Sequence, residues 1–152
     1  MDKIDEQLIA ILVGNARVSL KELSQQVNLS SPSTSERLRR LEEHSIIRSY
    51  TLDLDPQAFG YSLQAIVRVT PLVGMLNKVE KIIQETPECI ECDKVTGDDC
   101  FICRLYIHSI EQLDTIIDRW AEQAETHTSI VKKSPVTRRL PPLVQPTKST
   151  KS

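Results

Sequence analysis

The 152-residue sequence predicts an α+β protein in which an N-terminal (winged) helix-turn-helix domain precedes a ferredoxin-like βαββαβ domain. Two patterns predict this order. Residues 1–50 contain three short amphipathic helical segments with capping signals. Residues 61–140 alternate between the apolar periods of strands and of helices in the order strand, helix, strand, strand, helix, strand. Pro56 and Gly60 mark the connection, so we expect a linker strand or hinge at residues 51–60.

The first predicted helix spans residues 2–13. Asp2 is a suitable N-cap, because its carboxylate can accept hydrogen bonds from free amides of the first turn. Gly14 and Asn15 are expected to end the helix, since both tolerate positive φ. An apolar stripe on one side is formed by Ile4, Leu8, Ile11 and Leu12.

The second predicted helix spans residues 20–27. Ser19 and Glu22 have the spacing of a capping box, in which each side chain satisfies a backbone amide of the other residue. Leu20, Leu23 and Val27 are its expected buried residues. Asn28 then supplies a turn, and Leu29 is expected to pack beneath that turn.

The third predicted helix lies between residues 29 and 45, with Ser31 as N-cap and Pro32 at its first helical position. At about 100° per residue, one side packs against the domain. That side carries Thr34, Leu38, Leu41 and Ser45. The opposite side carries Ser33, Glu36, Arg37 and Arg40, with Arg39 on the flank.

A tight turn between two short helices, followed by a helix with a small polar first turn and outward arginines, is typical of a DNA-binding helix-turn-helix. Hydroxyls and amides at the start of such a helix meet phosphates, and arginines reach phosphates or guanine edges. The candidate contacts to double-stranded DNA are Ser31, Ser33, Thr34, Glu36, Arg37, Arg39 and Arg40. The alternative is a solvated surface helix with ion pairs such as Glu36 to Arg40.

After this helix, residues 48–55 alternate between polar and apolar side chains and are predicted to form a strand. Ile46 and Ile47 are expected to close the core of the first domain.

The second half is predicted to contain four strands and two helices. The strands are expected at residues 61–70, 88–96, 100–108 and 129–140, and the helices at residues 72–86 and from the cap Ser109 to about Ala124. Both helices should cover one face of an antiparallel sheet. The other face lacks a cover, which predicts a homodimer through this domain. Residues 141–152 are expected to be a disordered tail.

Charge is distributed unevenly along the chain. Residues 1–50 hold seven basic and seven acidic side chains, residues 51–131 hold six and fourteen, and residues 132–152 hold six and none. Attraction to DNA must therefore be local. No leader segment and no apolar run of about 18 residues is present, so we expect a cytoplasmic protein without a membrane partner. No phosphate loop, nucleophile–base pair or carboxylate pair indicates an enzyme, and no cofactor is expected.

The chain resembles the Lrp/AsnC (feast/famine) family of transcription regulators over residues 1 to about 140. The matching segments are Asp2-Lys-Ile-Asp5, Arg17-Val-Ser-Leu-Lys-Glu-Leu23, Val27-Asn-Leu-Ser30, Glu36-Arg-Leu-Arg-Arg-Leu-Glu42, Ile46-Ile-Arg-Ser-Tyr50 and Val95-Thr-Gly-Asp98. The resemblance implies a DNA-reading N-terminal domain and an effector domain. It also implies dimers that assemble into octamers or similar discs, with an amino acid bound between dimers.

In that family the turn after the second effector-domain strand usually has the order Gly-Asp-aromatic-Asp-aromatic and lines the ligand pocket. Here the order is Gly97-Asp98-Asp99-Cys100-Phe101, so Asp99 replaces an aromatic residue and Cys100 replaces the second aspartate. The resemblance implies effector contacts from Thr96, Gly97, Asp98, Asp99 and Cys100. An acidic side chain there can pair with a ligand ammonium, and the alternative is a solvated hairpin tip.

Four cysteines form two Cys-x-x-Cys pairs, Cys89 with Cys92 and Cys100 with Cys103. Positions i and i+3 of a strand point to opposite faces, which argues against one zinc ion held by all four thiolates. A hairpin turning at Gly97 would place Cys92 opposite Cys103. Structural thiols, redox sensing and metal sensing remain open, and a thiol- or metal-responsive switch is the second functional hypothesis. The histidines His44, His108 and His127 show no chelating spacing, so no metal site is assigned.

Overall fold

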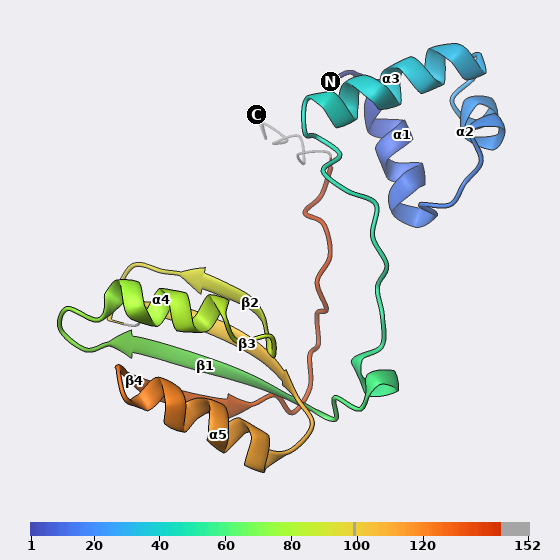
Figure 1. The fold of residues 1–152 in the computed structure, drawn as a ribbon. Coiled ribbons are helices and arrows are strands. Elements are labelled where there is room, and N and C mark those ends of the chain that lie inside the picture. The colour runs from blue at the N-terminus through green and yellow to red at the C-terminus, as the bar shows by residue number, and fades with distance from the viewer. Residues whose placement is uncertain (99, 144–152) are drawn as a thin grey trace, which may run out of the picture. The chain divides into compact units, whose positions relative to one another are not determined.

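The computed structural model describes residues 1–98 and 100–143, which form two compact units (Figure 1). The first comprises Met1–Asp53 and the described residues after Thr137, and the second comprises Leu54–Thr137. Asp99 and most of the predicted tail, residues 144–152, lie outside the described residues. No helix in the described part is both long enough and apolar enough to span a bilayer.

The first unit contains the three helices that the sequence predicts: α1 (Lys3–Gly14), α2 (Leu20–Gln26) and α3 (Ser31–Glu43). They pack around Leu8, Leu23 and Val27, which are buried. The predicted caps of α1 and α2 are present. The Asp2 carboxylate accepts hydrogen bonds from the amides of Ile4 and Asp5, and the Ser19 hydroxyl accepts one from the amide of Glu22.

Several local expectations for this unit are wrong. The helix α1 ends at Gly14 and Asn15 as predicted, but Asn15 is extended rather than at positive φ, and its amide donates to the carbonyl of Ile11. Leu20 is 40% exposed rather than buried. The N-cap of α3 is Ser30 rather than Ser31. Ser30 has the extended backbone that a cap requires, and its hydroxyl accepts from the amide of Ser33.

The end of α3 also differs from the expectation. Ser45 has left the helix at φ 56°, and its amide donates to the carbonyl of Glu42 while the amide of Ile46 donates to that of Leu41. This is the hydrogen-bond pattern of a Schellman cap. The sharp turn leaves Ile46 48% exposed, so it does not close the core as expected.

The strand predicted at residues 48–55, the wing of the first domain, is not formed in the described chain. Alternating side chains make a segment suitable for a sheet, but a strand also needs a neighbour for its amides and carbonyls. These residues have no such ladder. The segment leads into a single 3₁₀ turn, Pro56–Phe59, which ends at Gly60 with φ 85°.

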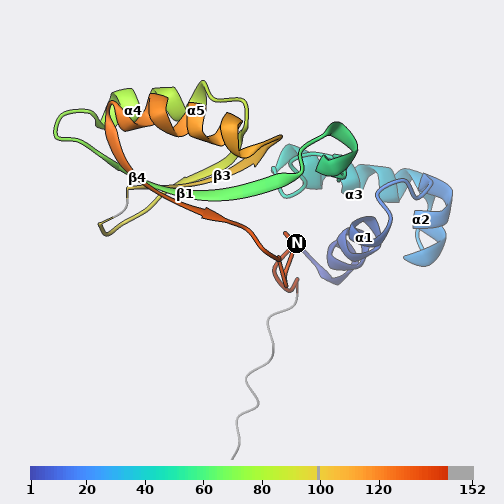
Figure 2. The same ribbon diagram turned by 90° about the horizontal axis from the view of Figure 1, so that it is seen from below.

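The second unit is the predicted βαββαβ arrangement. Its elements are β1 (Leu63–Pro71), α4 (Leu76–Gln84), β2 (Cys89–Lys94), β3 (Phe101–Ile107), α5 (Ile110–Ala121) and β4 (Ala124–Ile130). The strands form one antiparallel sheet in the order β2-β3-β1-β4, and both helices lie on the same face of it (Figures 1 and 2). The fold class is therefore confirmed.

Two of the predicted element boundaries in this unit are wrong. The helix α4 begins at Leu76 rather than Leu72, because Gly74 at φ 79° makes a turn that a helix cannot contain. The strand β4 covers residues 124–130 rather than 129–140. Its threonine-rich sequence has little apolar content, but its backbone pairs with β1 from Ala65 opposite Ile130 to Pro71 opposite Ala124.

The core of the second unit lies between the sheet and the two helices. It is built from strand side chains that face the helices together with apolar side chains of α4 and α5. Its buried members are Ala65, Val67, Val69, Val79, Ile83, Phe101, Cys103, Leu105, Ile107, Leu113, Ile116, Trp120 and Ala124. Alternate residues of the same strands, including Ile66 and Ile102, face the side that carries neither α4 nor α5.

Candidate nucleic-acid interface and effector turn

The outer side of α3 carries a row of exposed polar and charged side chains. Arg39 is held between two glutamates of the same helix, with 2.6 Å between its Nη2 and the Oε1 of Glu36 and a second ion pair to Glu43. The hydrogen bond from Arg39 lowers the pKa of Glu36. These pairs are solvent-exposed, and solvent screens them strongly. They can therefore rearrange when a phosphate group competes for Arg39.

Arg40 is exposed, and its guanidinium makes no hydrogen bond or ion pair within the described part of the chain. The ion pair between Glu36 and Arg40 that was considered as the alternative is not formed, because the Glu36 carboxylate is paired with Arg39 instead. Arg40 borders an open depression, which is also lined by Met1, Asp2, Asp5, Arg37, Leu41, His44 and Ile46. A cation with no competing internal partner is available to an external anion.

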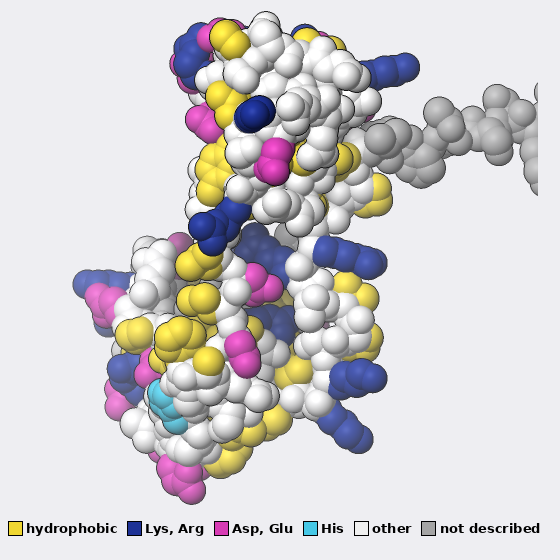
Figure 3. All heavy atoms as spheres, turned by 90° about the vertical axis from the view of Figure 1, so that its right-hand side faces the viewer, with side chains coloured by type: hydrophobic (Ala, Val, Ile, Leu, Met, Phe, Trp, Pro, Cys, Tyr) yellow, Lys and Arg dark blue, Asp and Glu magenta, His cyan; other side chains and the backbone are white. Residues whose placement is uncertain are grey.

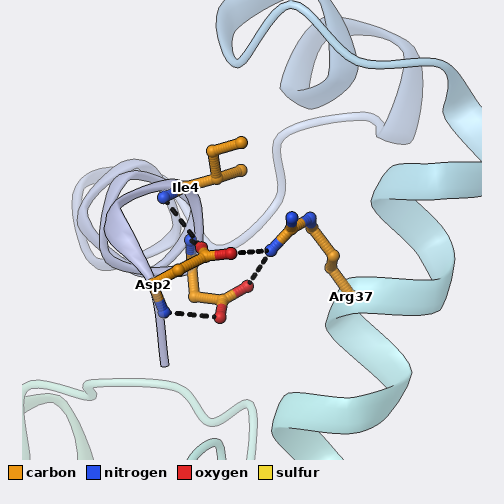
Figure 4. Close-up of polar contacts among 4 residues, drawn as sticks. Asp2, Ile4 and Arg37 are labelled. Atoms are coloured by element: carbon orange, nitrogen blue, oxygen red, sulfur yellow. Dashed lines mark hydrogen bonds and ion pairs between the residues drawn. The ribbon is translucent and has the colours of Figure 1, made fainter.

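Arg37 does not lie on the outward side, which corrects the sequence prediction. Its Nη1 lies 2.8 Å from Asp2 Oδ2 and 2.8 Å from Asp5 Oδ1, and its side chain is only 20% exposed. Figure 4 shows the side chain reaching from α3 to the first turn of α1. The hydrogen bonds to Asp2 and Asp5 raise the pKa of Arg37. The helical wheel misplaced it because an arginine on the flank is long enough to reach the neighbouring helix.

Thr34 is also removed from the possible contact surface. Its side chain is fully buried, and its hydroxyl donates to the carbonyl of Ser30 at 3.0 Å. Ser31 is half-buried and lies 3.3 Å from the hydroxyl of Ser24, measured between the two Oγ atoms. Ser33 is exposed and accepts a hydrogen bond from Ser30. Of the small polar residues predicted at the start of α3, Ser33 is therefore the accessible one.

Sequence reasoning missed the cluster formed by Asp2, Asp5 and Arg37. The available signal was the pair of aspartates three residues apart at the start of the first helix, which is a capping pattern. The sequence did not indicate that these carboxylates also bind a side chain of the third helix.

This cluster predicts an acid-sensitive first unit. The amide of Asp5 and the guanidinium of Arg37 hold the pKa of Asp2 at about 2, below its ordinary value of 3.8. A carboxyl with a depressed native pKa stabilises the fold above its unfolded pKa, and that stabilisation is lost as the pH falls through the native value. We expect the melting temperature of the first unit to fall between pH 4 and pH 2.

Thermal melts at stepped pH measure this effect. Asp2→Asn keeps a good helix cap but cannot ionise, so its melting temperature should depend less on pH in this window. Asp118→Asn, which removes one exposed carboxylate from α5, is the matched control and should follow the parent protein. Identical pH curves for Asp2→Asn and the parent protein would contradict the assigned role of Asp2.

The predicted effector residues lie on the turn between β2 and β3. Thr96, Gly97 and Asp98 are exposed there, and the turn is closed by the amide of Val95 donating to the carbonyl of Cys100 at 2.9 Å. Gly97 has φ 109°, a conformation that favours glycine. Cys100 is half-buried and packs against the core of the second unit.

The arrangement of the cysteines agrees with the sequence expectation for Cys92 and Cys103 but not for Cys89. Cys92 lies directly opposite Cys103, as predicted from the turn position. Cys89, however, faces the same side of the sheet as Cys92, because a β-bulge between Cys89 and Glu91 inserts one extra residue. Three thiols thus approach one another on the helix side. In the described residues, no group of three or more His, Cys, Asp and Glu side chains is arranged to hold a metal ion.

A three-helix domain with an exposed arginine-bearing third helix, joined to a βαββαβ domain, defines the class of two-domain helix-turn-helix transcription regulators. On the visible face, charged side chains of both signs are interspersed with hydrophobic ones (Figure 3). This face is therefore not uniformly basic.

Comparison with known families makes the assignment specific. Residues 1–42 match the AsnC-type helix-turn-helix domain, and residues 64–141 match the Lrp/AsnC ligand binding domain. The chain belongs to the Lrp/AsnC family of transcriptional regulators. The family that the sequence resembles is thereby confirmed.

Individual relatives agree with this assignment. The HTH-type transcriptional regulator LrpC of Bacillus subtilis is 30% identical over 131 residues, which cover 86% of this chain and 91% of LrpC. The regulator FL11 of Pyrococcus horikoshii is 31% identical over 137 residues, covering 88% and 91%. The solved structure of B. subtilis LrpC has a TM-score of 0.84 and covers 91% of this chain and 99% of that one.

Another solved structure is a transcriptional regulator from Neisseria meningitidis in complex with L-methionine. It has a TM-score of 0.87 at 25% identity and covers 94% of this chain and 97% of that one.

Proposed function

We propose that this regulator binds double-stranded DNA as a symmetric homo-oligomer, inserting α3 of each protomer of a dimer into successive major grooves. The observation that carries the proposal is the division of the arginines on α3. Arg37 is neutralised by Asp2 and Asp5, whereas Arg40 is exposed and, among the residues that the structure describes, its guanidinium forms no hydrogen bond or ion pair. An arginine that is free of internal partners at the surface of a third helix is suited to contact a phosphate or a guanine edge.

The other side chains of α3 take supporting roles in this proposal. Arg39 and Ser33 contact phosphates, Ser31 contributes at the start of the helix, and Glu36 limits the approach of other anions to Arg39. Arg37 is a positioning residue, because its ion pairs fix the angle between α3 and α1. Thr34 positions the first turn through its hydrogen bond to Ser30.

The assembly is proposed to form through the second unit. The sheet face opposite α4 and α5 carries Ile66 and Ile102, which are partly exposed. A partly apolar sheet face is suited to a second copy of the same chain. Dimers are proposed to associate further into an octamer or a similar assembly.

The effector is proposed to be an amino acid that contacts the turn between β2 and β3. This part of the proposal is supported by the likeness to the Neisseria meningitidis regulator in its complex with L-methionine. The exposed carboxylate of Asp98 can pair with an ammonium group, and the exposed backbone at Gly97 allows close approach of a ligand. Asp99 and Cys100 are the remaining proposed contacts. We propose that the protein acts in the cytoplasm by binding alone, without catalysis.

A thermal-shift screen of the twenty amino acids on the full chain tests the effector proposal, because a ligand that binds the native state raises its melting temperature. We expect a concentration-dependent increase with at least one amino acid and a smaller increase for Asp98→Ala. Glu111→Ala, an exposed position on α5, is the matched control. An Asp98→Ala variant that responds as strongly as the parent protein would contradict the role of Asp98.

The DNA proposal has a separate test. Selection of bound duplexes from a random pool should enrich a pseudo-palindrome with half-sites about one helical turn apart. Enrichment of no common sequence would contradict sequence-specific binding.

A further inference from the structure

Three of the four cysteines gather on the helix side of the hairpin formed by β2 and β3. Cys92 and Cys103 are directly paired across the two strands, and their sulfur atoms lie 3.4 Å apart. Cys89 joins them because the bulge at Ile90 returns its side chain to the same face. The hydrogen bond from the Cys103 thiol lowers the pKa of Cys89.

The two paired thiols differ in access to solvent. Cys92 is exposed on β2, which is an edge strand of the sheet (Figure 1). Cys103 is fully buried in the core beneath it. A small oxidant can therefore reach the sulfur of Cys92, while Cys103 is protected from solvent but remains within reach of Cys92.

We propose that Cys92 and Cys103 form a reversible disulfide when the protein meets a hydroperoxide. The sulfur of Cys92 takes one oxygen from hydrogen peroxide and becomes a sulfenic acid, with release of one water. The sulfur of Cys103 then attacks this sulfur, and the S–S bond forms as a second water leaves. The two thiols lose two electrons and two protons in total, and the peroxide is reduced to two waters.

The pairing of the two strands already suits a disulfide bond between Cys92 and Cys103. Residues directly opposite each other in an antiparallel pair have Cα atoms about 4.5–5.5 Å apart, which lies within the range of disulfides. The sulfurs need to move about 1.4 Å closer to reach bonding distance. Rotation of the two side chains can supply this change without moving the strands.

The protonation state of the thiols controls the rate at which the disulfide forms. Burial raises the pKa of Cys92 above its ordinary value of 9.0, and the thiolate is the reactive form. Hydrogen bonding to Cys89 and burial raise the pKa of Cys103, which keeps its proton available to its neighbours. We therefore expect the disulfide to form faster at pH 8.5 than at pH 7.

The hairpin that contains this pair also carries Thr96, Gly97 and Asp98. A bond between Cys92 and Cys103 would fasten the edge strand β2 to β3 and close a short loop that includes this turn. A connection from oxidation to effector binding rests on the proposed function. The disulfide itself does not, so its test needs neither DNA nor an amino acid.

The experiment uses the reduced full chain treated with hydrogen peroxide at the two pH values. Maleimide labelling counts the remaining thiols, and mass spectrometry of peptides from non-reduced protein maps any disulfide. We expect a loss of two thiols per chain, an intramolecular link between Cys92 and Cys103, and full recovery with dithiothreitol. Cys100→Ser and Cys89→Ser should each retain this link.

Cys92→Ser should abolish the link without disturbing the fold, because Cys92 is exposed. Cys103→Ala provides a second test at the buried position. A mapped bond that involves Cys89 or Cys100, a bond between chains, sulfinic acid at Cys92 in place of a disulfide, or four intact thiols after treatment would each overturn the proposal. None of these outcomes bears on whether the protein binds DNA or an amino acid.

Discussion

Replacing Trp120 by alanine is expected to lower the free energy of unfolding of the second unit by about 3–5 kcal/mol, the usual cost of deleting a buried tryptophan. Trp120 is 1% exposed and fills the space between α5 and the sheet. Its Nε1 also donates to the hydroxyl of Thr86 at 3.2 Å. The substitution removes a large apolar volume together with a buried hydrogen bond.

Urea unfolding followed by circular dichroism measures this change, since Trp120 is the one tryptophan of the chain and its fluorescence is lost with it. Trp120→Phe keeps an aromatic ring but loses the indole donor, and should cost less than the alanine variant. Thr86 keeps a hydrogen bond from Arg119 and donates to the carbonyl of Ile82 in both variants. A loss below about 1 kcal/mol for Trp120→Ala would show that the core collapses to fill the space.

Replacing Arg40 by alanine is expected to weaken specific DNA binding by about 1–3 kcal/mol if its guanidinium contacts a base, which corresponds to roughly 5- to 150-fold in Kd. The reason is its exposure on α3 without an internal ion pair, in contrast to Arg37. In the described part of the chain, removing the Arg40 side chain therefore breaks no hydrogen bond or ion pair. Electrophoretic mobility shifts or fluorescence anisotropy with a selected duplex measure the loss.

The salt dependence of binding then separates two roles for Arg40. A phosphate contact predicts weaker binding to all sequences and a salt slope smaller by about one, whereas a base contact predicts relaxed preference at one position of the site. Lys78→Ala removes one exposed positive charge from α4 and is the matched control. Equal affinities of Arg40→Ala and the parent protein would contradict a DNA contact by Arg40.

The candidate interface shows where sequence reasoning stops. The helical wheel correctly placed Leu41 inward and Arg40 outward, because both lie near the centre of their faces. It failed for Arg37 on the flank, whose environment depends on the position of the neighbouring helix. It correctly placed Thr34 on the packing side, where the structure buries it, so counting Thr34 among the candidate DNA contacts was wrong.

The cysteines of β2 and β3 show the same limit of sequence-based prediction. Pairing of Cys92 with Cys103 followed from the position of the turn at Gly97, since an antiparallel register is fixed once the turn is known. The orientation of Cys89 did not follow. A single inserted residue reverses the side to which a strand residue points, and the sequence contains no clear signal for a bulge at Ile90.

By itself, the sequence determined the three helices of the first unit, the βαββαβ order of the second, the helix caps at Asp2 and Ser19, and the family. These features depend on local hydrogen bonding and on the periodicity of apolar residues, which are properties of short segments. The tertiary structure alone decided which arginines of α3 are free, where β4 begins, whether residues 48–55 pair with a neighbour, and which thiols meet. Each of these depends on distances between segments far apart in the chain, and packing and backbone pairing fix those distances.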